Sequence, residues 1–239
     1  MSGHSKWATI KHKKGKSDAK RGQLFTKISK EISVVAREGG GDPAANARLR
    51  LLIEKAKAAN MPNENVTRAI KRGTGEIAGA HYEAATYEAY GPFGIAIMVE
   101  TLSDNKNRTA SELRHLFTKA GGSLAESGAV AWMFDRLGVI SALDQDISED
   151  SVIEALMDYD VDNVEYHDGN VTVTCNAQEL DAVKKACQMV GLKVESAEMA
   201  WVAKNEIVLS DKEQEEKVVK LLDALDELDD VQNVYASLG

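Results

Sequence analysis

The chain has 239 residues, of which 44% are hydrophobic and 28% charged, and its formal net charge at pH 7 is -9. This composition is typical of a globular protein with one to three domains and excludes collagen-like and low-complexity classes. No apolar stretch approaches the roughly 18 residues needed to span a bilayer, and no apolar signal core follows the basic N-terminus. We expect a soluble, cytoplasmic protein that has no membrane partner.

Residues that could carry catalysis or hold a metal form no recognisable motif. The two cysteines, Cys175 and Cys187, lie twelve positions apart without a CxxC pair, which argues against both a disulfide framework and a zinc site. The five histidines are scattered, and the sequence has neither a P-loop nor a GxGxxG motif. We therefore predict no cofactor, no metal and no enzymatic activity, with a catalytic site built from distant residues as the open alternative.

Positive charge is concentrated at one end of the chain. Residues 1–80 contain 17 Lys or Arg and 7 Asp or Glu, a balance of +10. The remaining 159 residues contain 12 basic and 31 acidic residues, a balance of -19. This asymmetry favours an N-terminal unit that binds a polyanion and an acidic remainder that does not, unless the latter holds a basic protein partner.

The first 80 residues are predicted to form a basic arm followed by helices. Residues 1–17 lack periodicity, and we expect them to order only on binding. Apolar spacing and helix-breaking residues predict three helices. The first begins at Asp18, and the third begins after Pro62. The second begins with Asp42 as N-cap and Pro43 as the first helical residue. Glycines end the first and third, and a linker reaches about Ala80.

The first helix is predicted to be amphipathic, with a basic face. On a helical wheel, its apolar residues fill an arc of roughly 40° to 160° and its basic residues one of roughly 260° to 360°. Such a face is either an ordinary solvated surface or a phosphate contact. The arm supplies further lysines without balancing carboxylates, which favours the contact. The basic candidates in this unit are Lys6, Lys11, Lys13, Lys14, Lys16, Lys20, Arg21, Lys27 and Lys30.

Strand signals begin at Tyr82. Two antiparallel strands flank GPFG, a helix follows with Ser103 or Asp104 as N-cap, and AVAWMFD is predicted as a further strand that completes a ββαβ unit. Residues 139–202 then follow the βαββαβ order of a ferredoxin-like fold. The last helix and strand lack a local partner, so we expect them to return to the ββαβ unit. The acidic runs of the last helix and the residues after it, DKEQEEK and LDALDELDD, are interpreted as a solvated helix face.

A second basic group lies on the helix of the ββαβ unit. Free backbone N–H groups at a helix start, together with amide and basic side chains, suit a phosphate. A well-capped helix with turn-forming asparagines is the alternative reading. The shared sign of charge with the N-terminal unit favours the phosphate contact. The candidates are Asn105, Lys106, Arg108, Arg114 and Lys119.

The three tryptophans have different surroundings. Trp7 lies in the basic arm, where it would either stack on an unpaired base or anchor the arm to the helical unit. Trp132 and Trp201 lie in apolar strand patterns and are predicted to be core residues.

These segments resemble the YebC/PmpR family, which includes mitochondrial translational activators of cytochrome oxidase. The resemblance runs through GHSKWATIKHKKGKSDAKRGQLFTKISKEI, GGGDPAANARLRLLIEKAKAANMPNENVTRAIKRGTG, YEAYGPFGIAIMVETLSDNKNRTASELRHLFTKAGGSL and VAWMF, and so covers nearly the whole chain. It implies an α+β fold in which a three-helix domain precedes two α/β domains with antiparallel sheets, the inserted one ferredoxin-like. The expected domains are 1–80, 81–134 with 205–239, and 135–204.

The resemblance also implies a role in gene expression. Some members are described as DNA-binding transcriptional regulators, and others look like factors that act on translation at the ribosome. We therefore expect a nucleic-acid-binding regulator, with DNA or ribosomal RNA as the partner. A helix of the N-terminal unit could enter a DNA major groove, while the arm with Trp7 suits RNA at least as well.

Overall fold

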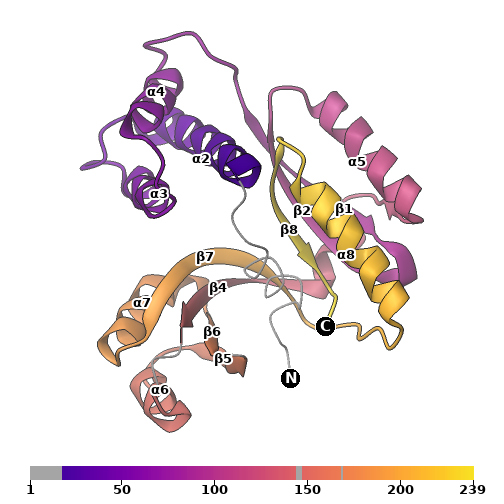
Figure 1. The fold of residues 1–239 in the computed structure, drawn as a ribbon. Coiled ribbons are helices and arrows are strands. Elements are labelled where there is room, and N and C mark those ends of the chain that lie inside the picture. The colour runs from indigo at the N-terminus through magenta and orange to yellow at the C-terminus, as the bar shows by residue number, and fades with distance from the viewer. Residues whose placement is uncertain (1–17, 144–146, 168) are drawn as a thin grey trace.

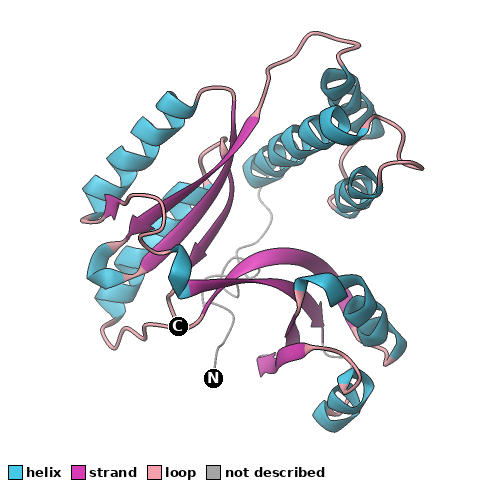
Figure 2. Ribbon diagram, turned by 180° about the vertical axis from the view of Figure 1, so that it is seen from behind, coloured by secondary structure: helices cyan, strands magenta, loops and turns pink. Residues whose placement is uncertain are grey.

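A computed structural model of the chain describes residues 18–143, 147–167 and 169–239, and it gives an α+β fold (Figures 1 and 2). Its described part contains a helical unit and two four-stranded antiparallel sheets, each with helices on one face. The α+β class expected from the sequence is confirmed. In the described part of the chain, no helix is both long and apolar enough to cross a membrane.

The helical unit consists of α2 (Asp18–Gly39), α3 (Ala47–Ala58) and α4 (Asn63–Thr74). Its core is small and apolar, and Ile32, Leu49 and Ala69 are almost fully buried. Gly73 allows α4 to approach α2 closely, because a Cβ at this position would lie 2.3 Å from the Ser33 carbonyl oxygen. Gly75 then ends α4 in the left-handed conformation that favours glycine.

The first sheet combines segments far apart in the sequence. It has the order β3 (Ser123–Leu124), β1 (Glu83–Tyr90), β2 (Ala96–Ser103) and β8 (Val231–Ala236), with β8 antiparallel to β2. Both α5 (Lys106–Ala120) and α8 (Lys212–Asp226) cover one face of the sheet (Figure 1). The C-terminal strand therefore lies beside the strand that precedes α5.

The second sheet has the ferredoxin-like order β5-β6-β4-β7. Its elements in chain order are β4 (Phe134–Leu143), α6 (Glu149–Leu156), β5 (Val161–His167), β6 (Asn170–Cys175), α7 (Leu180–Met189) and β7 (Lys193–Ala203). Val152 and Leu156 of α6 and Val183 and Cys187 of α7 pack with the sheet in one apolar cluster. The predicted ferredoxin-like fold of this segment is confirmed.

A half-buried carboxylate links the two sheets. Glu100 of β2 accepts hydrogen bonds from Arg136 at 2.7 Å and from Trp201 Nε1, Asn233 and Tyr235 at 3.1 Å each. These donors come from β4, β7 and β8. Burial and the Glu100 carboxylate raise the pKa of Tyr235. The network fixes the second sheet against the first.

The segment AVAWMFD was predicted as a strand of the first sheet, and this prediction is wrong. Ala131–Met133 form a 3-10 turn, and Phe134 begins β4 of the second sheet. The buried Glu88 carboxylate accepts hydrogen bonds from the backbone N–H groups of Gly128, Val130 and Ala131 at 2.7, 2.7 and 2.8 Å. These N–H groups are therefore not available to a strand ladder.

The same turn overturns the expectation for Trp132, which is 67% exposed rather than buried. Its indole Nε1 donates to the Ala129 carbonyl oxygen at 3.0 Å. Trp201 is half-buried, with the Arg136 guanidinium 5.2 Å from its ring centroid. Two predicted N-caps are also corrected, because Asn46 caps α3 in place of Asp42, and Asn105 caps α5.

Candidate nucleic-acid interface

The start of α5 is fixed by a short polar turn. Asn105 has an extended backbone, and its side-chain oxygen accepts from the Arg108 backbone N–H at 3.1 Å. The Ser103 hydroxyl accepts from the Asn105 N–H at 2.9 Å and lies 2.7 Å from the Thr109 hydroxyl oxygen. This arrangement places Lys106 and Arg108 at the first turn of the helix.

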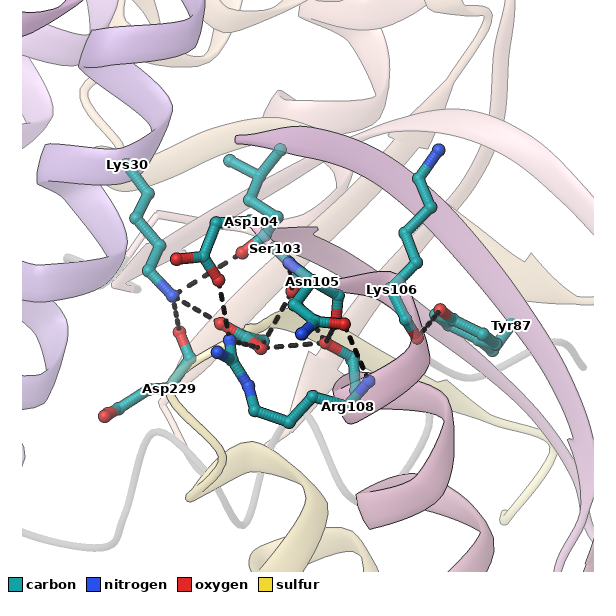
Figure 3. Close-up of polar contacts among 11 residues, drawn as sticks. Lys30, Tyr87, Ser103, Asp104, Asn105, Lys106, Arg108 and Asp229 are labelled. Atoms are coloured by element: carbon teal, nitrogen blue, oxygen red, sulfur yellow. Dashed lines mark hydrogen bonds and ion pairs between the residues drawn. The ribbon is translucent and has the colours of Figure 1, made fainter. Parts of the chain in front are cut away.

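Both of these basic side chains lie beside carboxylates, and Figure 3 shows the contacts of Arg108. Lys106 Nζ lies 2.5 Å from Glu83, and this contact raises the pKa of Lys106 and lowers that of Glu83. Arg108 lies 2.9 Å from Asp104 and 2.7 Å from Asp230. Hydrogen bonds to these two carboxylates raise the pKa of Arg108. The charge expected at the start of α5 is therefore largely balanced within the protein.

Asp230 is the centre of this polar network. Its buried carboxylate accepts from Lys30 Nζ at 2.7 Å, Ser103 Oγ at 3.0 Å, Arg108 at 2.7 Å and Thr109 Oγ1 at 2.8 Å. Burial acts to raise its pKa, but the hydrogen bonds from Lys30, Arg108 and Thr109 outweigh burial and hold the pKa well below its usual range. Three elements, α2, β2 and α5, thus converge on one residue of the turn before β8.

On the basic face predicted for α2, Lys27 and Lys30 are not accessible to solvent. Both side chains are buried, and Lys27 Nζ lies 2.9 Å from the Asp226 carboxylate and 2.8 Å from its backbone oxygen. Lys30 Nζ also binds the Asp229 backbone oxygen at 2.7 Å (Figure 3). The expectation that these two lysines face solvent is wrong, because residues 226–230, at the end of α8 and just after it, cover them.

Other predicted residues do remain accessible. Arg114 and Lys119 are exposed on α5, and neither forms an ion pair with any residue in the described ranges. Arg21 is exposed on α2, whereas the side chain of Lys20 and all of Lys6, Trp7, Lys11, Lys13, Lys14 and Lys16 lie outside what the structure describes. Among the described residues, the cations of α5 that have no ion pair therefore lie at its middle and C-terminal turns.

The structure adds exposed basic residues that no motif in the sequence marks. Lys57 of α3 and Lys71 and Arg72 of α4 are exposed and have no ion pair within the described ranges. A high density of basic residues in the helical segments was the only signal for them. The acidic run LDALDELDD predicts a solvated helix face, and nothing in it indicates that Asp230 is buried.

An open cavity of about 420 Å³ lies at the start of α5. Its lining includes Lys106 but also the carboxylates of Glu83 and Asp104. This mixture of charges disfavours an isolated anion at that point. Among the residues that the structure describes, no three His, Cys, Asp or Glu side chains are grouped so as to hold a metal ion.

Comparison with known proteins assigns the family. Residues 5–76 match the model of the TACO1/YebC protein N-terminal domain, and residues 82–238 match that of the TACO1/YebC second and third domain. A probable transcriptional regulatory protein of Chlorobaculum tepidum is 52% identical over 239 residues, which cover 100% of this chain and 95% of that protein. One from Thermoanaerobacter pseudethanolicus is 52% identical over 236 residues, 98% of this chain and 96% of that protein.

The fold is also found in a solved structure. The crystal structure of a conserved hypothetical protein from Aquifex aeolicus superposes with a TM-score of 0.88 at 45% identity. The match covers 98% of this chain and 97% of that one. From its sequence along nearly the whole length and from its fold, the chain belongs to the TACO1/YebC family.

Proposed function

We propose that this protein is a DNA-binding regulator of transcription in the cytoplasm, and that it acts without catalysis. The observation that carries the proposal is the set of exposed cations left over after internal pairing. Arg114 and Lys119 on α5, together with Lys57, Lys71 and Arg72 in the helical unit, face solvent on a chain whose net charge is -9. The relatives named probable transcriptional regulatory proteins support the same role.

Phosphate contacts would supply the binding energy. Each phosphate that a Lys or Arg neutralises releases condensed counterions, so the logarithm of the binding constant falls with the logarithm of salt concentration by about 0.9 for each contact on duplex DNA. The lysines of the arm, Lys11, Lys13, Lys14 and Lys16, are proposed to contribute in the same way. The second candidate partner, RNA, becomes an outcome of the test.

The test is a set of binding titrations of the full chain with a fluorescein-labelled DNA duplex and an RNA hairpin of equal charge, at several salt concentrations. In the variant Arg114→Ala/Lys119→Ala, we expect the salt slope on DNA to fall by about 2, because two phosphate contacts are lost. The control, Lys184→Ala/Lys185→Ala on α7, removes the same charge from the acidic part of the chain and leaves the slope unchanged.

The arm is tested separately with Lys11, Lys13, Lys14 and Lys16 all replaced by alanine, which is expected to lower the slope by about 3 to 4. A slope that is the same in both variants and the wild type would exclude these residues as phosphate contacts. Tighter binding to the RNA hairpin than to the duplex at equal salt would replace DNA by RNA as the partner.

A further inference from the structure

The contact between the helical unit and the first sheet is made by long polar side chains. Gln23, Lys27 and Lys30 follow the spacing i, i+4, i+7, so they share one face of α2. Gln23 Nε2 donates to the Glu227 backbone oxygen, Lys27 binds Asp226, and Lys30 binds Asp229 and Asp230. Residues 226–230, which we call the acidic turn, thus receive all three donors.

Among the residues that the structure describes, no apolar cluster spans this contact. The buried cluster of the helical unit and the cluster beneath α5 and α8 have no residue in common. The connecting segment, residues 75–81, is exposed along its whole length and includes Gly75 and Gly79. Two units that are joined by an exposed linker and polar contacts can separate without exposing a hydrophobic core. The main loss on separation is electrostatic.

The acidic turn offers α2 what a nucleic-acid backbone would offer. The carboxylates of Asp226 and Asp230 lie 2.9 and 2.7 Å from the two ammonium groups. The carbonyl oxygens of Asp226 and Glu227 lie at the C-terminus of α8, where the helix dipole adds partial negative charge. A row of phosphates presents the same oxygen ligands to the same donors.

We infer that the acidic turn is an internal competitor of nucleic acid, and that it covers Lys27 and Lys30 until a bound polyanion displaces it. This inference rests on the proposed function and adds regulation to it. In the closed form, the protein binds through its exposed cations alone. In the open form, α2 adds two phosphate contacts, so binding to a long polyanion is accompanied by separation of the helical unit from the acidic turn.

The test joins the two sides of the contact covalently. In the variant Gln23→Cys/Glu227→Cys, the new thiols are bridged with a short bismaleimide, while the native Cys175 and Cys187 are buried. The matched control is the same variant with each new thiol blocked separately by N-ethylmaleimide. On the labelled DNA duplex, we expect the bridged protein to bind at least fivefold more weakly than the blocked one, with a salt slope lower by about 2.

A second pair of variants does not depend on crosslinking. Asp226→Asn weakens the hold of the acidic turn on Lys27 and should tighten duplex binding more than Glu216→Gln does. The control removes one carboxylate charge from the exposed face of the same helix, where Glu216 is paired only with Lys220 among the described residues. The comparison therefore separates opening of the contact from a general change in net charge.

The outcomes separate this inference from the function on which it rests. Equal affinities of the bridged and blocked proteins, or equal effects of Asp226→Asn and Glu216→Gln, would overturn the competitor role and leave DNA binding intact. If neither the wild type nor the blocked protein binds the duplex with a salt-dependent affinity, the proposed function fails, and the inference fails with it.

Discussion

Replacing Asp230 by asparagine leaves the shape of the side chain nearly unchanged but removes the charge that four donors share. The carboxylate is 6% exposed and accepts from two cations and two hydroxyls at 2.7 to 3.0 Å. In the variant, the NH2 group of the asparagine amide points at groups that are themselves hydrogen-bond donors. Lys30, whose side chain is 8% exposed, loses its only carboxylate partner in the described part of the chain. The carbonyl oxygens of Asp229 and Leu102 remain for it.

The expected loss of stability follows from this geometry. Breaking a buried ion pair by removing one partner costs about 3 to 5 kcal/mol, because the other charge stays buried without compensation. Arg108 is less affected, since its side chain is 46% exposed and retains Asp104. We therefore expect Asp230→Asn to lower the free energy of unfolding by about 3 to 5 kcal/mol at neutral pH.

Urea denaturation followed by tryptophan fluorescence and circular dichroism measures this change. The control is Asp229→Asn, whose carboxylate is exposed and which serves Lys30 only through its backbone oxygen. We expect the control to stay within about 0.5 kcal/mol of the wild type. A loss below 1 kcal/mol for Asp230→Asn, or equal losses for the two variants, would refute the assignment of Asp230 as the charge that the network requires.

The pH dependence gives a second check on Asp230. Its pKa in the folded protein is held below the ordinary value of 3.8. A depressed pKa stabilises the folded state above the ordinary value, and this stabilisation is lost as the pH falls below it. The difference between the wild type and Asp230→Asn should therefore be largest at neutral pH and should shrink in acid below about pH 4.

The remaining predictions concern burial at other positions. Burial, with a contribution from Glu165, raises the pKa of Glu206 to about 7. The stability of the folded protein that goes with the protonated carboxyl is therefore present below the ordinary pKa and is lost as the pH rises through 7. Glu206→Gln should reduce the fall in melting temperature between pH 5 and pH 8. Trp132→Ala should change the free energy of unfolding by less than about 0.5 kcal/mol, whereas Phe117→Ala, at a fully buried position, should lower it by about 3 to 5 kcal/mol in urea denaturation. Burial raises the pKa of both native thiols to about 11, so iodoacetamide at pH 8 should label neither in the folded protein and both in urea.

Local signals in the sequence were sufficient for most elements. Apolar spacing and the glycines after each helix predict α2 and α4, because the pattern of burial and the end of the helix depend on neighbouring residues. The βαββαβ order predicts the fold of the second sheet for the same reason. The charge asymmetry between the two parts of the chain is likewise a property of the sequence alone.

Only the tertiary structure decided which charged residues are free. Lys27 and Lys30 have the same side chain as Lys57 and Lys71, and no local pattern tells the buried pair from the exposed pair. The difference arises because β8 returns to the first sheet and brings the acidic turn beside α2, about 200 positions away in sequence. Trp132 is exposed for a related reason, since the hydrogen bonds from the turn to Glu88 connect residues about 40 positions apart. Pairing between distant segments depends on how the chain packs, so spacing within one helix or strand does not determine it.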